Sequence, residues 1–181
     1  MYYPTIIEGD FVKLRSVVPE DAEFILSLRL NPGLNKYLNK VSNKISAQKN
    51  WINNQIETEG DYYFMILNTN ENKIGTISLY NVEKGQGEFG RWISTGNAVE
   101  TTESVILIHY FGFEKLGLQL IYSKTVQENI KVLNFHKNFG ATLTGEIYVN
   151  KNGFRLEKAI IEKKDFKTIK DKNYKLLNLL K

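Results

Sequence analysis

The sequence contains no cysteine, and among its 181 residues there are only 2 histidines and 3 prolines. The absence of cysteine excludes a disulfide scaffold, a thiolate-ligated metal site and a cysteine nucleophile. Two histidines are too few for a multi-histidine centre, so no metal is expected. No run approaches the ~18 apolar residues that cross a bilayer, and residues 1–10 lack the features of a signal peptide. We therefore expect a soluble, cytoplasmic protein.

The positive charge is small and unevenly placed. Lys and Arg total 24 against 20 Asp and Glu, a net charge of +4, and much of the excess lies in residues 163–181. Charge placed in this way is more typical of a solvated segment than of a phosphate-binding face, and no nucleic-acid recognition motif accompanies it. We expect no nucleic-acid partner, and we predict that residues 165–181 form a basic, helical C-terminal tail.

The chain has the length of one domain, so we assign residues 1–181 to a single domain. Strands are predicted from two-residue alternation and helices from apolar residues at helical spacing. The strands are expected at residues 10–16, 62–67, 74–80, 88–93, 118–126, 142–149 and 154–161, and the helices at 19–30, 46–56, 101–116 and 129–138. Ser46 is the predicted cap of the second helix, and Gly75 and Gly90 predict bulges or close backbone contacts. The element order is β-α-α-β-β-β-α-β-α-β-β.

Several segments follow one another at a particular spacing. They are Phe11-Val12-Lys13-Leu14-Arg15 with Pro19-Glu20-Asp21-Ala22, Ile74-Gly75-Thr76-Ile77-Ser78-Leu79, Glu88-Phe89-Gly90-Arg91-Trp92-Ile93, Phe113-Glu114-Lys115-Leu116-Gly117-Leu118, and Phe135-His136-Lys137-Asn138-Phe139-Gly140. Together they resemble the Gcn5-related N-acetyltransferase (GNAT) superfamily, and most closely its branch of ribosomal-protein N-terminal and amino-sugar-nucleotide acetyltransferases. The resemblance implies an α/β (mixed α+β) GNAT fold, a mostly antiparallel sheet of about seven strands flanked by helices.

A narrower similarity concerns the acceptor. Arg29-Leu30-Asn31-Pro32, Tyr37-Leu38, Ile45-Ser46 and Trp51-Ile52 resemble acetyltransferases of nucleotide-linked 4-amino-4,6-dideoxy sugars, as in pseudaminic acid biosynthesis. This similarity implies that Arg29, Asn31 and Tyr37 bind the acceptor. Arg29 suits a diphosphate because its planar guanidinium matches phosphate oxygens. The alternative is an ordinary cation at a helix end, where the dipole favours it.

The resemblance implies acetyl-CoA as co-substrate, with its pyrophosphate at the loop before the long helix. Backbone N–H groups at a helix N-terminus attract an anion, and Glu100, Thr101 and Thr102 lie at that position. The loop departs from the family's glycine-rich pattern because residues 94–103 contain one glycine, and Glu100 and Glu103 add negative charge near an anion. The alternative is an acidic helix start that binds no cofactor.

Trp92, Ile93 and Asn129 complete the cofactor site that the resemblance implies. The pantetheine arm is expected to pair with the strand edge at residues 89–93, where a bulge frees a backbone N–H for the thioester oxygen. Asn129 matches a family asparagine, and His136 stands where the family often has an acidic tyrosine. A histidine with a pKa of about 6.5 is suited to protonate a thiolate near neutral pH. The alternative is that His136 only packs in the core.

Glu88 is the predicted general base, because it lies on the strand that is expected to line the cleft and the attacking amine must lose a proton. The alternative is a strand-end glutamate without a chemical role. With no cysteine, we expect direct attack by the amine rather than a covalent acetyl-enzyme.

These predictions describe an acetyl-CoA-dependent N-acetyltransferase, in surface-glycan biosynthesis, whose acceptor is the 4-amino group of a nucleotide-linked dideoxy sugar. The alternative acceptors are a protein N-terminus, a polyamine or a small antibiotic amine, and a further alternative is a non-catalytic binding module with the GNAT fold. A basic acceptor mouth would favour a phosphorylated acceptor and an acidic one a polyamine. The oligomeric state is left open between a monomer and a homodimer.

Overall fold

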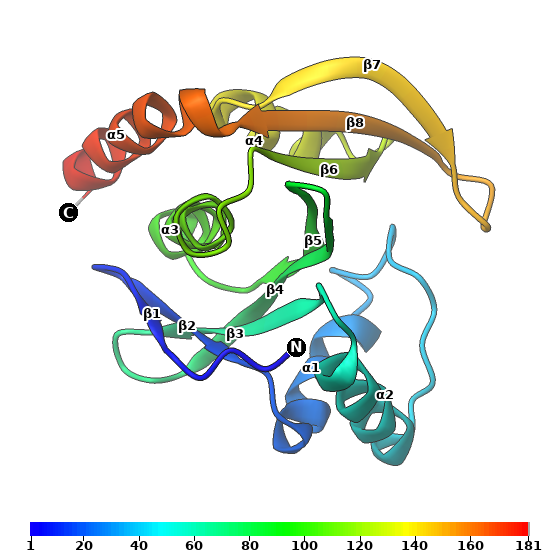
Figure 1. The fold of residues 1–181 in the computed structure, drawn as a ribbon. Coiled ribbons are helices and arrows are strands. Elements are labelled where there is room, and N and C mark those ends of the chain that lie inside the picture. The colour runs from blue at the N-terminus through cyan, green and yellow to red at the C-terminus, as the bar shows by residue number, and fades with distance from the viewer. Residues whose placement is uncertain (181) are drawn as a thin grey trace.

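The computed structural model describes residues 1–180 and consists of a single twisted sheet with helices packed against it (Figure 1). The sheet is 8-stranded, in the order β1-β2-β3-β4-β5-β6-β8-β7. The strands are β1 (Ile7–Glu8), β2 (Val12–Ser16), β3 (Tyr62–Asn68), β4 (Lys73–Glu83), β5 (Gln86–Ser94), β6 (Leu120–Val126), β7 (Thr142–Val149) and β8 (Arg155–Glu162). Neighbouring strands are antiparallel except β5 and β6, which are parallel.

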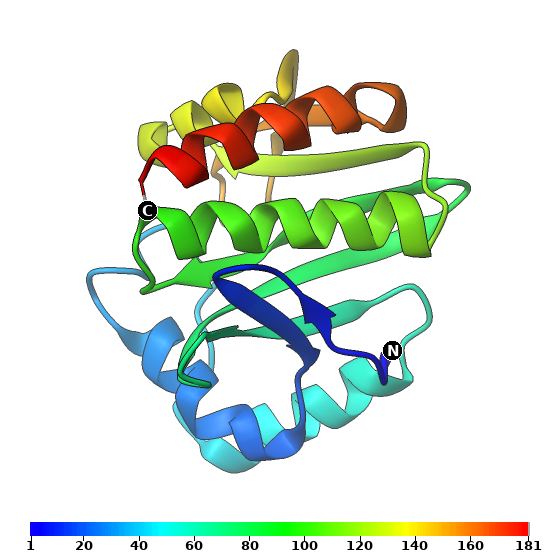
Figure 2. The same ribbon diagram turned by 90° about the vertical axis from the view of Figure 1, so that its left-hand side faces the viewer.

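The helices cover both sides of this sheet. They are α1 (Ala22–Leu30), α2 (Ile45–Glu57), α3 (Ala98–Tyr110), α4 (Ile130–Phe139) and α5 (Lys163–Leu179). In Figure 1, α1 and α2 lie below β3 and β4, whereas α3 lies between the two halves of the curved sheet. Figure 2 shows α3 and α5 running side by side across that face. No helix within residues 1–180 has both the length and the apolar composition needed to cross a membrane.

Two groups of buried side chains hold the layers together. The larger surrounds α3 and includes Phe64, Phe111 and Phe113, while the smaller joins α1 and α2 to the sheet through residues such as Ile25 and Ile52. These residues come from the apolar positions of the predicted strands and helices. The predicted mixed α+β architecture, a mostly antiparallel sheet flanked by helices, is confirmed.

Several boundaries differ from the predictions. The two-residue strand β1 was not predicted and makes the sheet one strand wider than expected. Ser46 does not cap α2, because the helix already begins at Ile45 and its N-cap is Lys44. The long helix starts at Ala98 instead of residue 101, since Asn97 is its N-cap.

The C-terminal tail is helical as predicted, but it is not merely solvated. In α5, Phe166, Ile169 and Leu177 are buried, because they form an apolar stripe that packs against the larger core. Lys164, Lys167, Lys172 and Lys175 of this helix are exposed.

The parallel pair β5–β6 is short. It pairs only Gln86–Glu88 with Leu120–Tyr122, and beyond Glu88 the two strands separate. A bulge in β5 lies at the point of separation: Ser78 of β4 faces Gly90 and Thr76 faces Ile93, so Arg91 and Trp92 together face a single residue. Arg91 has a left-handed φ of 47°, which a non-glycine residue rarely adopts. The predicted irregularity next to Gly90 is confirmed.

Candidate active site

The open side of the β5–β6 split is a cleft of about 580 Å³, which we call the splayed cleft. It is lined by β5, β6, the start of α4, the segment after α1 and the β7–β8 turn. Six of the predicted site residues line it, namely Arg29, Tyr37, Glu88, Trp92, Asn129 and His136. The fold thus brings together residues that are more than a hundred positions apart in the sequence.

The other predicted site residues are not brought into this cleft. Asn31 does not line the cleft, and its side-chain oxygen accepts the N–H of Gly33 in the turn after α1; its role in acceptor binding stays a prediction. The side chain of Ile93 is buried in the larger core, which leaves only its backbone for a cofactor. Glu100, Thr101 and Thr102 lie on the first turns of α3, outside the cleft lining.

Glu88 is buried and its carboxylate is surrounded by donors. Oε1 accepts a hydrogen bond of 2.9 Å from the Tyr80 hydroxyl. Oε2 lies 3.2 Å from the Asn81 side-chain nitrogen and 3.4 Å from Lys124 Nζ. Burial and the negative charge of Glu88 raise the pKa of Tyr80, so Tyr80 remains a protonated donor. The arrangement fixes one carboxylate, as an acceptor, in the wall of the cleft.

His136 is buried against aromatic rings. Its imidazole lies 5.7 Å from the ring of Phe89, and its Nε2 is 3.5 Å from the hydroxyl of Ser123. Burial lowers the pKa of His136 to about 4, so the imidazole is neutral at pH 7. This differs from the sequence-based argument, which assumed an ordinary histidine pKa. The general-acid role of His136 stays a prediction, and the structure does not favour it.

The start of α3 differs from an open anion site. Asn97 Oδ1 accepts the N–H groups of Val99 and Glu100, both at 2.9 Å, and Glu100 Oε2 accepts the Asn97 N–H at 2.8 Å. Thr101 is also engaged, because its hydroxyl bonds to Ser94 and to the Gly96 carbonyl. These side-chain oxygens occupy donors that a pyrophosphate would otherwise meet.

The cleft itself fits the pantetheine arm of acetyl-CoA better than this helix start fits the pyrophosphate. The separation of β5 from β6 exposes strand edges, and a β-bulge typically takes its extra residue out of the strand ladder. The indole N–H of Trp92, which lines the cleft, is buried and has no hydrogen-bond partner among the described residues. A ligand carbonyl in the cleft would supply that partner.

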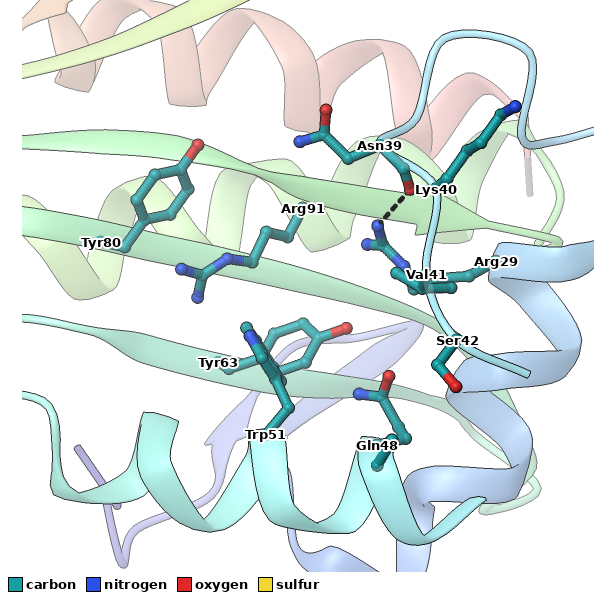
Figure 3. A pocket seen from close by; sticks show the side chains of 11 residues that line it. Arg29, Asn39, Lys40, Val41, Ser42, Gln48, Trp51, Tyr63, Tyr80 and Arg91 are labelled. Atoms are coloured by element: carbon teal, nitrogen blue, oxygen red, sulfur yellow. Dashed lines mark hydrogen bonds between the residues drawn. The ribbon is translucent and has the colours of Figure 1, made fainter. Parts of the chain in front are cut away.

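A second cavity of about 540 Å³ adjoins the cleft and shares Arg29, Asn39, Tyr80 and Arg91 with it. We call it the aromatic pocket (Figure 3). Its lining comes from α1, the segment after α1, α2, β3, β4 and β5 and consists of Arg29, Asn39, Lys40, Val41, Ser42, Ala47, Gln48, Trp51, Tyr63, Tyr80 and Arg91.

The two arginines of the aromatic pocket are in different states. Arg91 forms a bidentate pair with Asp61, at 2.6 and 2.8 Å. Arg29 has no carboxylate partner; one terminal nitrogen donates to the Asn39 carbonyl at 3.0 Å, and its buried Nε has no partner among the described residues. Burial and the positive charge of Arg91 contribute to a lowered pKa of Arg29. Arg29 is thus a cation without a bound carboxylate, and its guanidinium N–H groups are suited to bind an anion.

A third cavity, the outer groove, lies on the other side of the segment after α1. Arg29, Lys36, Lys40 and Lys151 line it, and its lining includes no carboxylate. The aromatic pocket likewise has no carboxylate in its lining. The mouth of the site is therefore basic.

Several site residues were missed from the sequence. Gln48, Trp51, Tyr80 and Arg91 line the aromatic pocket, yet they lie on three separate elements and share no spacing pattern. The available signals were Trp51, which belongs to the segments that resemble the amino-sugar acetyltransferases, and Arg91, a charged residue next to Gly90 in the predicted strand.

The comparisons with known proteins agree with this architecture. The profile of the family "Acetyltransferase (GNAT) domain" matches residues 12–142. Apo FdhC, a nucleotide-linked sugar GNAT, is 28% identical, with a TM-score of 0.81 and coverage of 98% of this chain and 99% of that one. No curated protein matches the sequence at the threshold used.

Two structures of lower sequence identity share the fold. A GCN5-related N-acetyltransferase from Brucella melitensis is 16% identical, with a TM-score of 0.82 and coverage of 97% of this chain and 86% of that one. A mutant of the spermidine N-acetyltransferase SpeG from Vibrio cholerae is 17% identical, with a TM-score of 0.74 and coverage of 87% and 97%.

Proposed function

Because the chain belongs to the GNAT acetyltransferase domain family, we propose that it transfers the acetyl group of acetyl-CoA to the amine of a nucleotide-linked amino sugar. The 4-amino group of a dideoxy sugar is the proposed acceptor. The similarity to FdhC over nearly the whole chain supports this acceptor class.

The observation that carries the proposal is the basic mouth. Arg29, Lys36, Lys40 and Lys151 line the outer groove without an acidic residue among them, and none of the four takes part in a salt bridge within residues 1–180. Unpaired cations attract a diphosphate and repel a polyamine. The geometry therefore favours a phosphorylated acceptor over spermidine-like amines.

In the proposed reaction, acetyl-CoA supplies an activated acyl thioester. Glu88 accepts a proton from the substrate amine, and a backbone N–H of the Arg91–Trp92 bulge donates to the acetyl oxygen as that oxygen becomes negative. The amine attacks directly, because no cysteine is present to carry the acetyl group. The proton lost by the amine balances the proton that the departing thiolate needs.

Thiol release is the direct test. The protein is incubated with acetyl-CoA and either a nucleotide-linked 4-amino-4,6-dideoxy sugar, spermidine or a peptide with a free N-terminus. We expect release with the sugar nucleotide at least ten-fold above that with the other amines. Faster release with spermidine, or no release above background with several sugar nucleotides, contradicts the proposed acceptor.

A further inference from the structure

The aromatic pocket combines a flat wall with a side-chain amide that faces the cavity. Gln48 of α2 is only 7% exposed, and its carboxamide makes no hydrogen bond to the described residues. Figure 3 shows this carboxamide pointing from α2 into the pocket. The polar atoms of this carboxamide are not among the buried atoms that lack a partner, so they stay accessible from the cavity and offer a donor and an acceptor, side by side, to a ligand.

The walls beside Gln48 are planar. Trp51 retains 40% exposure and stands edge-on to Tyr63, with ring centroids 5.7 Å apart. The Arg91 guanidinium lies 5.1 Å from the Trp51 ring and 4.3 Å from the Tyr80 ring. Such surfaces stack on flat, heteroaromatic ligands.

The charges divide this pocket into two zones. Arg91 is neutralised by Asp61, so the inner wall carries little net charge. The unpaired cations Arg29 and Lys40 also line the outer groove and therefore lie where the pocket meets that groove. A ligand with a flat, neutral group at one end and an anionic group beside that group matches these two zones.

We propose that the aromatic pocket binds the nucleobase of the sugar-nucleotide acceptor, with Gln48 reading the base edge and Trp51 stacking on its face. This inference rests on the proposed function. Gln48 would pair with adjacent donor and acceptor atoms of a base, as glutamine does in base recognition. The diphosphate then lies at Arg29 and Lys40, and the sugar extends into the splayed cleft toward Glu88.

The test uses the whole protein and measures thermal shift and dissociation constants with UDP, CDP, ADP, GDP and inorganic pyrophosphate. Binding to the native state raises the melting temperature. We expect at least one nucleotide to bind ten-fold or more tightly than pyrophosphate and to be preferred over the other bases. If pyrophosphate and all four nucleotides bind equally, the proposal of a nucleobase pocket is contradicted but the proposed function is not. If none of these anions binds, the proposed function is contradicted as well.

Two variants assign the preference to the pocket. Gln48→Met keeps the volume but removes the donor and acceptor, so we expect it to lose the base preference, about ten-fold, while its affinity for pyrophosphate stays unchanged. Asn53→Met, at an exposed position of the same helix, is the matched control and should keep the preference. Trp51→Leu should weaken the binding of all four nucleotides by a similar factor. Preserved base preference in Gln48→Met contradicts the proposal, and an unliganded melting curve identifies any variant that fails to fold.

Discussion

Glu88 is the residue on which the proposed chemistry depends most directly. It is the single carboxylate in the lining of the splayed cleft, and three donors hold it in place. Replacing it with glutamine keeps the shape and removes the proton acceptor. We expect Glu88→Gln to lower kcat about a hundred-fold, a typical loss for a general base, while KM for the acceptor changes by less than three-fold.

The control for this variant is Glu114→Gln, which changes an exposed glutamate outside the site. Its kcat should match that of the unaltered protein, and both variants should keep the native melting temperature within a few degrees. If the folded Glu88→Gln protein keeps an undiminished kcat, Glu88 is not the general base.

The two histidines predict how stability depends on pH. Burial lowers the pKa of both His109 and His136 to about 4, whereas an unfolded histidine has a pKa of about 6.5. Between these values the unfolded chain binds more protons than the native one, so the free energy of unfolding falls as the pH falls. Above pH ~6.5 both states are largely neutral at these histidines, and this loss of stability disappears. At pH 5 the loss is on the order of 2 kcal/mol per histidine.

Urea denaturation at pH 7 and pH 5 measures this loss. His136→Gln should be less stable at pH 7 yet show a smaller difference between the two pH values, by about 2 kcal/mol. Equal pH dependence in the variant and the unaltered protein would mean that His136 titrates normally in the folded state.

At the scale of elements, the first turn of α3 is where the chain departs from an open phosphate site. Glu100 caps the helix and stabilises it through the dipole, but its charge opposes the pyrophosphate of CoA. We expect Glu100→Gln, which keeps an oxygen to accept the Asn97 N–H, to bind CoA roughly three-fold more tightly, equivalent to about 0.6 kcal/mol. Calorimetric titration with CoA measures this change.

Glu57→Gln, at the exposed end of α2, is the control and should leave CoA affinity unchanged. Weaker CoA binding in Glu100→Gln would show that the carboxylate assists the cofactor, as its position in the predicted cofactor site implied.

The elements also show what the sequence could predict and why. The strand β2 was found because burial of one face imposes a two-residue period, which its burial pattern shows, whereas β3 and β4 stand out as continuous buried apolar runs. The strand β1 was missed because two residues carry no period, and the packing of α5 was left open because its lysines outnumber the residues of its apolar stripe. In the site, Arg29 and Glu88 were predicted from the resemblance to the GNAT superfamily, but Gln48 and Trp51 join Arg91 only through tertiary packing between α2 and β5.

At the scale of the whole molecule, the net positive charge lies in a different place from the positive charge that would bind the acceptor. The net +4 is matched by α5 alone, which carries lysines at 163, 164, 167, 170, 172 and 175 against aspartates at 165 and 171. The basic mouth is a local excess of positive charge formed by residues outside α5, and charges elsewhere in the chain balance it. Salt should therefore act on the acceptor through the mouth and not through the tail.

If the acceptor is anionic, raising NaCl from about 50 to about 500 mM shortens the Debye length from roughly 14 to 4 Å and should raise KM for the acceptor several-fold. Lys40→Gln with Lys151→Gln should raise KM at low salt and flatten this dependence, because both side chains line the outer groove. Lys167→Gln with Lys175→Gln removes the same charge from exposed positions of α5 and should leave both KM and its salt dependence unchanged. Steady-state kinetics at saturating acetyl-CoA provides the measurement. A KM that falls with salt would instead indicate a cationic acceptor, since screening then relieves repulsion between the acceptor and the mouth.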